Sequence, residues 1–238
     1  MSKKLVVLLM AILTHYDGFT QHIPDRSGHP DDFIPEGWKI LLDERGDLNH
    51  DGMDDLVLVI EDTNPENFKP NDGLDVDTLN LNPRMLLVLL KTDTGYTLGG
   101  KNTIGFIPSQ NTEDSPCLAD PLMESGGIEI SNGSLKIFFN YWLSCGSYYV
   151  NQAGYTFRYQ KSRFELIGFD HNEYHRASGD EHGISINFST GRKSETSGGN
   201  LFDEAENNPE TVWSEIRVDP FYILENCSAE TYFELLEL

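Results

Sequence analysis

Residues 38–60, WKILLDERGDLNHDGMDDLVLVI, contain two apolar segments separated by an acidic loop. Trp38–Leu42 alternates between apolar and polar faces and predicts a strand. Leu56–Ile60 is a continuous apolar run of strand length, which is typical of a central strand covered on both faces. The stretch therefore predicts a strand–loop–strand hairpin over residues 38–60.

The rest of the chain indicates more short strands. Asn132-Gly133 stands between two apolar runs and predicts a tight hairpin turn, because both residues tolerate a positive φ. The other expected strands are Met85–Leu90, Ile128–Ile130, Leu135–Tyr141, Tyr155–Tyr159, Arg163–Phe169, Ile184–Ser189, Lys193–Thr196, Val212–Ile216 and Tyr222–Leu224. Residues 22–35, 61–83 and 197–209 are expected to be irregular, and residues 229–238 are expected to form a short helix. We predict one all-β domain over 22–238 with mainly antiparallel sheets, arranged as a sandwich or as a partial propeller-like meander.

The chain of 238 residues is strongly acidic, with 39 Asp and Glu against 17 Lys and Arg and a net charge of −22. Such a chain repels polyphosphate and anionic lipid, which argues against nucleic-acid and membrane-surface partners. The acidity is concentrated in two segments: residues 43–77 hold 12 acids and two bases, and residues 203–238 hold 10 acids and one base.

The first 21 residues resemble an export signal. Lys3 and Lys4 precede the ten-residue apolar run Leu5–Thr14, which is too short to cross a bilayer. We predict a cleavable signal peptide over 1–21, with a buried N-terminal helix as the alternative. The mature chain is then expected in the periplasm or outside the cell, without an integral membrane segment.

Three cysteines in an oxidising compartment allow one disulfide within a chain. Cys117 and Cys145 both stand in turn-like contexts beside strand-like runs, so we predict that they pair. Cys227 is then expected to be a small buried hydrophobic residue. The two other pairings stay open at the level of the sequence.

The acidic loop of the first hairpin has the spacing of a metal site. Its pattern is D-x-N-x-D-G-x-x-D, with oxygen-bearing side chains at alternate positions and a glycine at the sixth position, which permits a sharp turn. All the donors are hard oxygens, which favours Ca²⁺ over zinc or copper. The expected ligands are the side chains of Asp47, Asn49, Asp51 and Asp55 and the backbone carbonyl of Met53.

The loop is not an EF-hand, because the twelfth position is Leu58 and strand-like segments flank it. It resembles the calcium loops of FG-GAP/VCBS-type repeats, as found in integrin α-chain propellers and secreted bacterial proteins. The matching residues are Asp47, Asn49, Asp51, Gly52 and Asp55, and the resemblance covers roughly residues 37–61. In that family such loops bind Ca²⁺ within a blade hairpin, although this chain holds one loop where the family normally has a series.

Three other features are weaker candidates. The acidic stretch Asp72–Asp77 lacks the calcium spacing and is interpreted as a solvated loop. The histidines His171, His175 and His182 are interpreted as exposed residues of a hairpin region rather than as a zinc or catalytic group. The aromatic residues of 141–159 offer either a sugar-stacking platform or, as the preferred interpretation, core packing.

Motifs for catalysis are absent: the chain holds no G-x-S-x-G, no H-E-x-x-H and no P-loop. The sequence therefore leans toward a noncatalytic function, with no catalytic residue assigned. We expect an exported calcium-binding β protein that acts as an envelope or extracellular binding module, with a glycan or a protein as its partner. The alternatives are a secreted glycan-active hydrolase and a protein-interaction module that uses the acidic segment 203–238.

Overall fold

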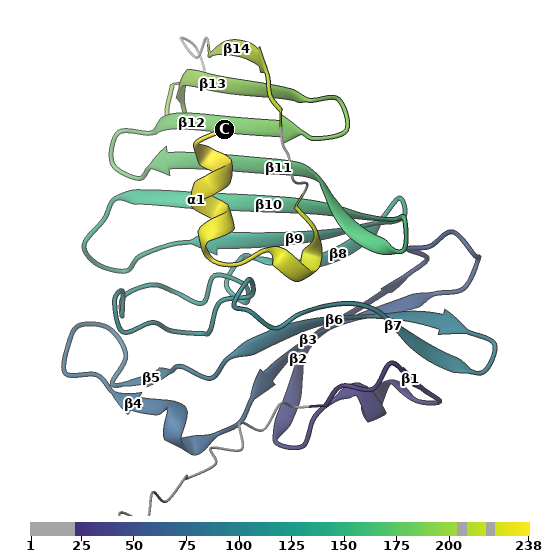
Figure 1. The fold of residues 1–238 in the computed structure, drawn as a ribbon. Helices are drawn as coiled ribbons and strands as arrows, with labels where there is room; N and C mark the ends of the chain where they lie inside the picture. The colour runs from purple at the N-terminus through teal and green to yellow at the C-terminus, as the bar shows by residue number, and fades with distance from the viewer. Residues whose placement is uncertain (1–21, 204–208, 218–221) are drawn as a thin grey trace, which may run out of the picture.

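The computed structural model describes residues 22–203, 209–217 and 222–238, and it is built mainly of antiparallel strands (Figure 1). The predicted signal peptide, residues 1–21, lies outside the described residues. The strands are β1 (Arg26–Ser27), β2 (Trp38–Gly46), β3 (Asp55–Asp62), β4 (Phe68–Pro70), β5 (Thr78–Asn80), β6 (Arg84–Thr92), β7 (Gly95–Asn102), β8 (Gly127–Ser131), β9 (Ser134–Tyr141), β10 (Tyr149–Gln160), β11 (Arg163–His175), β12 (Asp180–Asn187), β13 (Arg192–Asn200) and β14 (Glu210–Glu215). The helical elements are the 3₁₀ turns η1 (Pro30–Phe33), η2 (Pro65–Asn67) and η3 (Leu224–Asn226) and the helix α1 (Glu230–Leu236).

The strands form two large sheets and one small one. The five-stranded sheet has the order β1-β7-β6-β3-β2, and the seven-stranded sheet is a meander from β8 to β14. Strands β4 and β5 form a separate antiparallel pair. The predicted all-β class with antiparallel sheets and a short C-terminal helix is confirmed.

One hydrophobic core joins the two large sheets. It contains Val57 and Val88 from the five-stranded sheet together with Ile137, Tyr155 and Phe169 from the seven-stranded sheet. Helix α1 lies across the same inner face of the seven-stranded sheet (Figure 1), where it buries Leu235 completely. The inner face is therefore covered by a sheet at one end and by a helix at the other.

A second core lies on the opposite face of the five-stranded sheet. There Leu58 and Leu87 pack against Ile23 and Phe33 of the N-terminal segment. Strands β3 and β6 are consequently buried on both faces, as their continuous apolar sequences predict. The segment 22–35, which was expected to be irregular, contains β1 and η1 and covers this face (Figure 1).

Some boundaries differ from the prediction. The predicted strand Tyr222–Leu224 is present only as a single β-bridge, between Ile223 and Glu165 of β11. Leu224 begins the turn η3, where the Asn226 side chain accepts a hydrogen bond from the Ile223 amide at 2.8 Å. Strand β7 was not predicted, because Gly95, Gly99 and Gly100 interrupt its apolar pattern. Residues 197–200 continue β13 rather than starting a loop.

Within the described residues, no helix has both the length and the apolar character that crossing a membrane requires.

Candidate metal centre and other candidate sites

The predicted calcium loop is the connection between β2 and β3. These strands pair antiparallel from Trp38 opposite Asp62 to Gly46 opposite Asp55, so residues 47–54 form the tip of a hairpin. The loop curls through two residues with left-handed backbone, His50 (φ 62°) and Gly52 (φ 85°). The positive φ of Gly52 confirms the sharp turn that the glycine of the motif predicts.

The side chains of the loop turn inward onto its own backbone. The carboxylate of Asp47 accepts hydrogen bonds from the amides of Asp51 (3.1 Å) and Gly52 (2.9 Å). Asn49 Oδ1 accepts from the same Asp51 amide at 3.0 Å, and Asp51 Oδ1 accepts from the Met53 amide at 2.9 Å. The structure therefore brings together three of the predicted ligands, Asp47, Asn49 and Asp51.

Asp55 is at the base of the loop and is fully buried. Its two oxygens accept hydrogen bonds from the Leu48 amide at 2.9 Å and from the Lys91 amide, at the end of β6, at 2.8 Å. Burial raises the pKa of this carboxyl group, against the opposing effect of the backbone amides of Lys91, Leu48 and Asn49. Asp55 thus ties the loop to the five-stranded sheet, a role that the motif does not reveal.

The donor chemistry of the loop fits a hard cation, since a carboxylate that accepts one amide per oxygen keeps further lone pairs. Asp47 and Asp51 carry such carboxylates, and the amides that donate to them belong to the same exposed loop. Among the described residues, however, no group of three or more His, Cys, Asp or Glu side chains is placed to share one metal ion. The loop supplies two such side chains together with Asn49, because Asp55 is turned toward the backbone.

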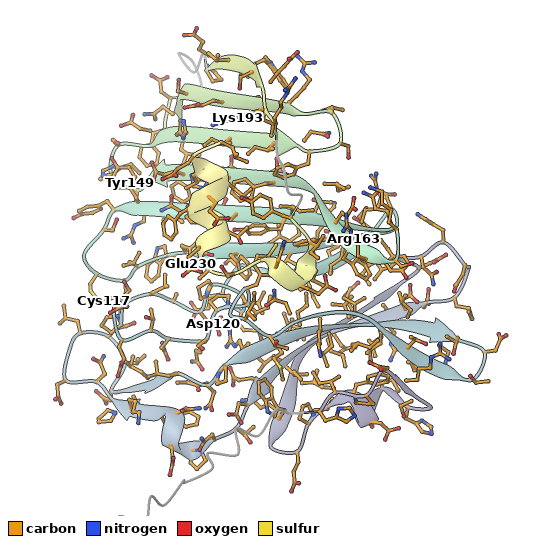
Figure 2. All side chains as sticks on the ribbon, in the orientation of Figure 1. Cys117, Asp120, Tyr149, Arg163, Lys193 and Glu230 are labelled. Atoms are coloured by element: carbon orange, nitrogen blue, oxygen red, sulfur yellow. A yellow bond between two sulfur atoms is a disulfide. The ribbon has the colours of Figure 1, made fainter. Side chains whose placement is uncertain are left out.

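The predicted disulfide between Cys117 and Cys145 is present, with a Cα–Cα distance of 5.6 Å. Figure 2 shows Cys117 and Asp120 on the connection between β7 and β8, which passes between the two large sheets. The Ser144 amide also donates to the Cys117 carbonyl at 2.9 Å. Cys227 is free and buried, and burial raises the pKa of its thiol to about 12.

The expectation that the three histidines are exposed loop residues is wrong. His171 is buried in β11, where its Nδ1 lies 3.3 Å from the Tyr232 hydroxyl of α1. Burial lowers the pKa of His171 to about 4, and the nearby His182 adds to this effect. His182 itself, in β12, lies 3.0 Å from Glu195 of β13. The polar sequence around His171 does not indicate that this residue faces the core, because its neighbours in β11 are mostly exposed or half-buried.

The aromatic residues of 141–159 do not form one platform. Tyr155 and Phe157 are buried, and both contact the edge of Phe106 in the core. Tyr148 is 64% exposed, and it holds Arg176 together with Trp142 through cation–π contacts. Core packing is therefore the role of the central residues in this segment.

The acidic stretch Asp72–Asp77 is exposed throughout. Its turn is organised by Asn71, whose side-chain amide donates to the carbonyls of Leu74 (3.1 Å) and Val76 (2.7 Å). Its carboxylates thus stay in solvent, in keeping with a solvated loop.

A buried ionic network joins residues that no sequence motif marks. Arg84, at the start of β6, donates to Glu61 of β3 at 2.8 Å and to both oxygens of Asp120 at 2.8 and 2.6 Å. All three side chains are at most 7% exposed. Because Arg84 and Asp120 are 36 residues apart, no local pattern predicts the contact.

Comparison with known proteins was made with family models, with curated proteins and with solved structures, and none of them matches this chain.

Proposed function

We propose that this protein is an exported, noncatalytic calcium-binding β protein that serves as a binding module of the cell envelope or the extracellular space. The observation that carries the proposal is the loop of residues 47–55. Its side-chain oxygens follow the spacing of a calcium loop, and Asp47, Asn49 and Asp51 come together at the tip of the β2–β3 hairpin.

In this proposal the ion is held by the side chains of Asp47, Asn49 and Asp51 and by the Met53 carbonyl. The fifth predicted ligand, Asp55, can bind the ion only through the lone pairs that its hydrogen bonds to the Leu48 and Lys91 amides leave open. The ion reduces the repulsion among the carboxylates of the loop and holds the hairpin in one conformation. Its role is structural, and no catalytic step is assigned to it.

Export is supported by the N-terminal sequence and by the disulfide. Two lysines followed by a ten-residue apolar run match a signal peptide. The bond between Cys117 and Cys145 is of a kind that persists in oxidising compartments.

Thermal unfolding tests the calcium site. A saturating excess of about 100 times the dissociation constant should add about 2.7 kcal/mol to the free energy of unfolding, because the ion binds only the folded state. EDTA should reverse this gain, and Asp51→Ala should abolish it. The matched control is Asp72→Ala, which removes an exposed acid from the other acidic loop. An identical melting curve of the wild type with calcium and with EDTA contradicts the proposal.

Asp55→Asn separates the two roles of that residue. If Asp55 is a ligand, the substitution lowers calcium affinity measured by calorimetry. If it acts only through the Leu48 and Lys91 amides, it lowers the melting temperature of the calcium-free protein and leaves the affinity unchanged.

The hydrolase alternative is tested by incubating the protein with neutral oligosaccharides and analysing them by chromatography. Intact oligosaccharides are the expected result, and shortened products would favour the enzyme.

A further inference from the structure

The outer face of the seven-stranded sheet, which is turned away from α1 and from the core, presents two parallel rows of side chains. The pairing of neighbouring strands defines these rows, because directly opposed residues point to the same side of a sheet. The first row runs across six strands through Phe138, Gly154, Asp170, Ser185, Ser194 and Trp213. The second row runs beside it through Asn140, Gln152, Asn172, Gly183, Thr196 and Thr211.

Nine of the twelve residues in the two rows line one shallow groove made of two adjoining hollows, whereas Asn140, Thr211 and Trp213 do not line it. A hollow of about 840 Å³ extends over the middle and far strands, and a second one of about 220 Å³ continues it toward Phe138. Gln152, Asp170 and Asn172 line both hollows, so the groove is continuous. Glycines at positions 154 and 183 leave it open, because these positions carry no side chain. The groove runs perpendicular to the strands.

The groove is rich in groups that pair with hydroxyls. Its second row consists of amides and hydroxyls around one glycine, and the amides both donate and accept hydrogen bonds. Gln152 donates to Asn140 at 3.3 Å, and Ser185 donates to Asp170 at 2.6 Å, so side chains of adjacent strands form hydrogen-bonded pairs. The amide pair keeps an N–H donor and a carbonyl acceptor for a ligand, and the Ser185–Asp170 pair keeps acceptors, so together they can bind neighbouring hydroxyls of a sugar ring.

Charge narrows the class of ligand. Among the residues of both rows, Asp170 alone is charged, and Glu173 and Glu181 add two more carboxylates to the lining of the larger hollow. Carboxylates in a protein with a net charge of −22 repel anionic ligands such as nucleic acids and acidic polysaccharides. A neutral polyhydroxyl ligand faces no such repulsion and can use every polar group of the second row.

Each end of the first row carries an exposed aromatic side chain. Phe138 is 39% exposed and lies beside Gly154, and Trp213 is 59% exposed with the Arg192 guanidinium 4.9 Å from its ring. Aromatic faces pack against the C–H faces of sugar rings. The two rings are five strand spacings apart, about 24 Å along the sheet. This length suits several linked sugars rather than one.

We propose that the outer face of the seven-stranded sheet binds a linear, neutral oligosaccharide that runs across strands β9 to β14. The amide row binds the hydroxyls, and Phe138 and Trp213 stack on sugars at the two ends. The proposal names the partner of the binding module described above. It is independent of calcium, because no residue of the 47–55 loop belongs to either row.

Calorimetry with defined oligosaccharides tests the proposal on the full chain. The probes are linear hexasaccharides of β-1,4-glucose, β-1,4-xylose, β-1,4-mannose and β-1,4-N-acetylglucosamine, each compared with its monosaccharide. We expect at least one hexasaccharide to bind. Its monosaccharide should bind at least about tenfold more weakly, since it makes fewer contacts. Oligogalacturonate of the same length should not bind. Absence of binding by all four neutral hexasaccharides at millimolar concentration overturns the proposal.

Variants locate the binding on this face. Asn172→Ala and Trp213→Ala each remove one exposed contact and should weaken the bound hexasaccharide about tenfold, equivalent to about 1.4 kcal/mol. The control is Phe233→Ala, which removes a 64% exposed aromatic ring from α1 on the opposite face and should leave affinity unchanged. Melting curves establish that each variant is folded. Affinity that is unaffected by both groove variants, or that falls equally in the control, overturns the proposal.

The two proposals fail separately. Repeating the titration in EDTA should give the same affinity for the hexasaccharide, whereas the melting temperature responds to calcium only if the loop binds the ion. Sugar binding lost in EDTA would overturn the independence of the groove from the loop.

Discussion

The two large sheets differ in how many of their faces are covered. In the five-stranded sheet, β3 and β6 are buried on both sides, by the core between the sheets and by the N-terminal segment 22–35. In the seven-stranded sheet, β10 alternates between buried and accessible residues, so one face is in the core and the other is in solvent. A sheet that is covered twice serves stability, whereas a sheet that is covered once keeps a surface on which a ligand can lie.

The largest effect is expected where the doubly covered sheet buries charge. Arg84→Ala leaves Asp120 buried without the guanidinium and leaves Glu61 with Lys39 as its remaining cation, which should lower the free energy of unfolding by about 3–5 kcal/mol. The control is Lys136→Ala, which removes a half-buried cation 3.9 Å from the exposed Glu129 and should cost less than about 1 kcal/mol. Urea unfolding measures both. Equal losses of unfolding free energy in the two variants would contradict the prediction that burial makes the network costly to disrupt.

The next largest effect is expected when an apolar side chain is removed from the doubly covered sheet rather than from the outer face of the seven-stranded sheet. Leu87→Ala in β6 creates a cavity between the sheet and the N-terminal segment and should cost about 2–5 kcal/mol. Phe138→Ala in β9 removes a larger side chain from the outer face, yet it should cost about 1 kcal/mol or less because that ring is 39% exposed. If urea unfolding gives similar losses, the outer face is covered in solution, for instance by a second copy of the chain.

The smallest effect concerns pH and the inner face of the seven-stranded sheet. Burial lowers the pKa of His171 to about 4, whereas the ring in the unfolded chain protonates near 6.5. The unfolded state therefore binds more protons between these values, so stability is full above about pH 6.5 and is lost as the pH falls toward 4. The loss should reach about 2–3 kcal/mol.

His171→Gln removes this titration and keeps a side chain that can face the Tyr232 hydroxyl. The difference in unfolding free energy between wild type and variant should therefore change across pH 4–6.5 and stay constant above it. A difference that is constant over the whole range would contradict the assignment.

Local patterns predicted much of the fold. The continuous runs of β3 and β6 predicted strands buried on both faces, and Asn132-Gly133 predicted the turn between β8 and β9, where both residues have a positive φ. Patterns failed where a tertiary contact overrides them. Glycines interrupt the apolar pattern of β7. The segment Tyr222–Leu224 is limited to one β-bridge, because η3 begins at Leu224 and the Asn226 side chain binds the Ile223 amide.

The candidate sites divide in the same way. The sequence named Asp47, Asn49 and Asp51, which the structure brings together, and the pair Cys117–Cys145, which it joins. It did not indicate that Asp55 is turned inward onto the Lys91 amide, because that partner lies 36 residues away. Calcium binding at this loop stays a prediction.

By itself, the sequence determined the class of fold, the calcium-like spacing of one loop and the acidity of the chain, since all three depend on neighbouring residues. Only the tertiary structure decided which faces are covered. It also aligned Phe138, Asp170 and Trp213 in one row, because the registers of five successive strand pairs set their alignment. Register across strands is fixed by packing of the inner face, and the outer face acquires its rows as a consequence.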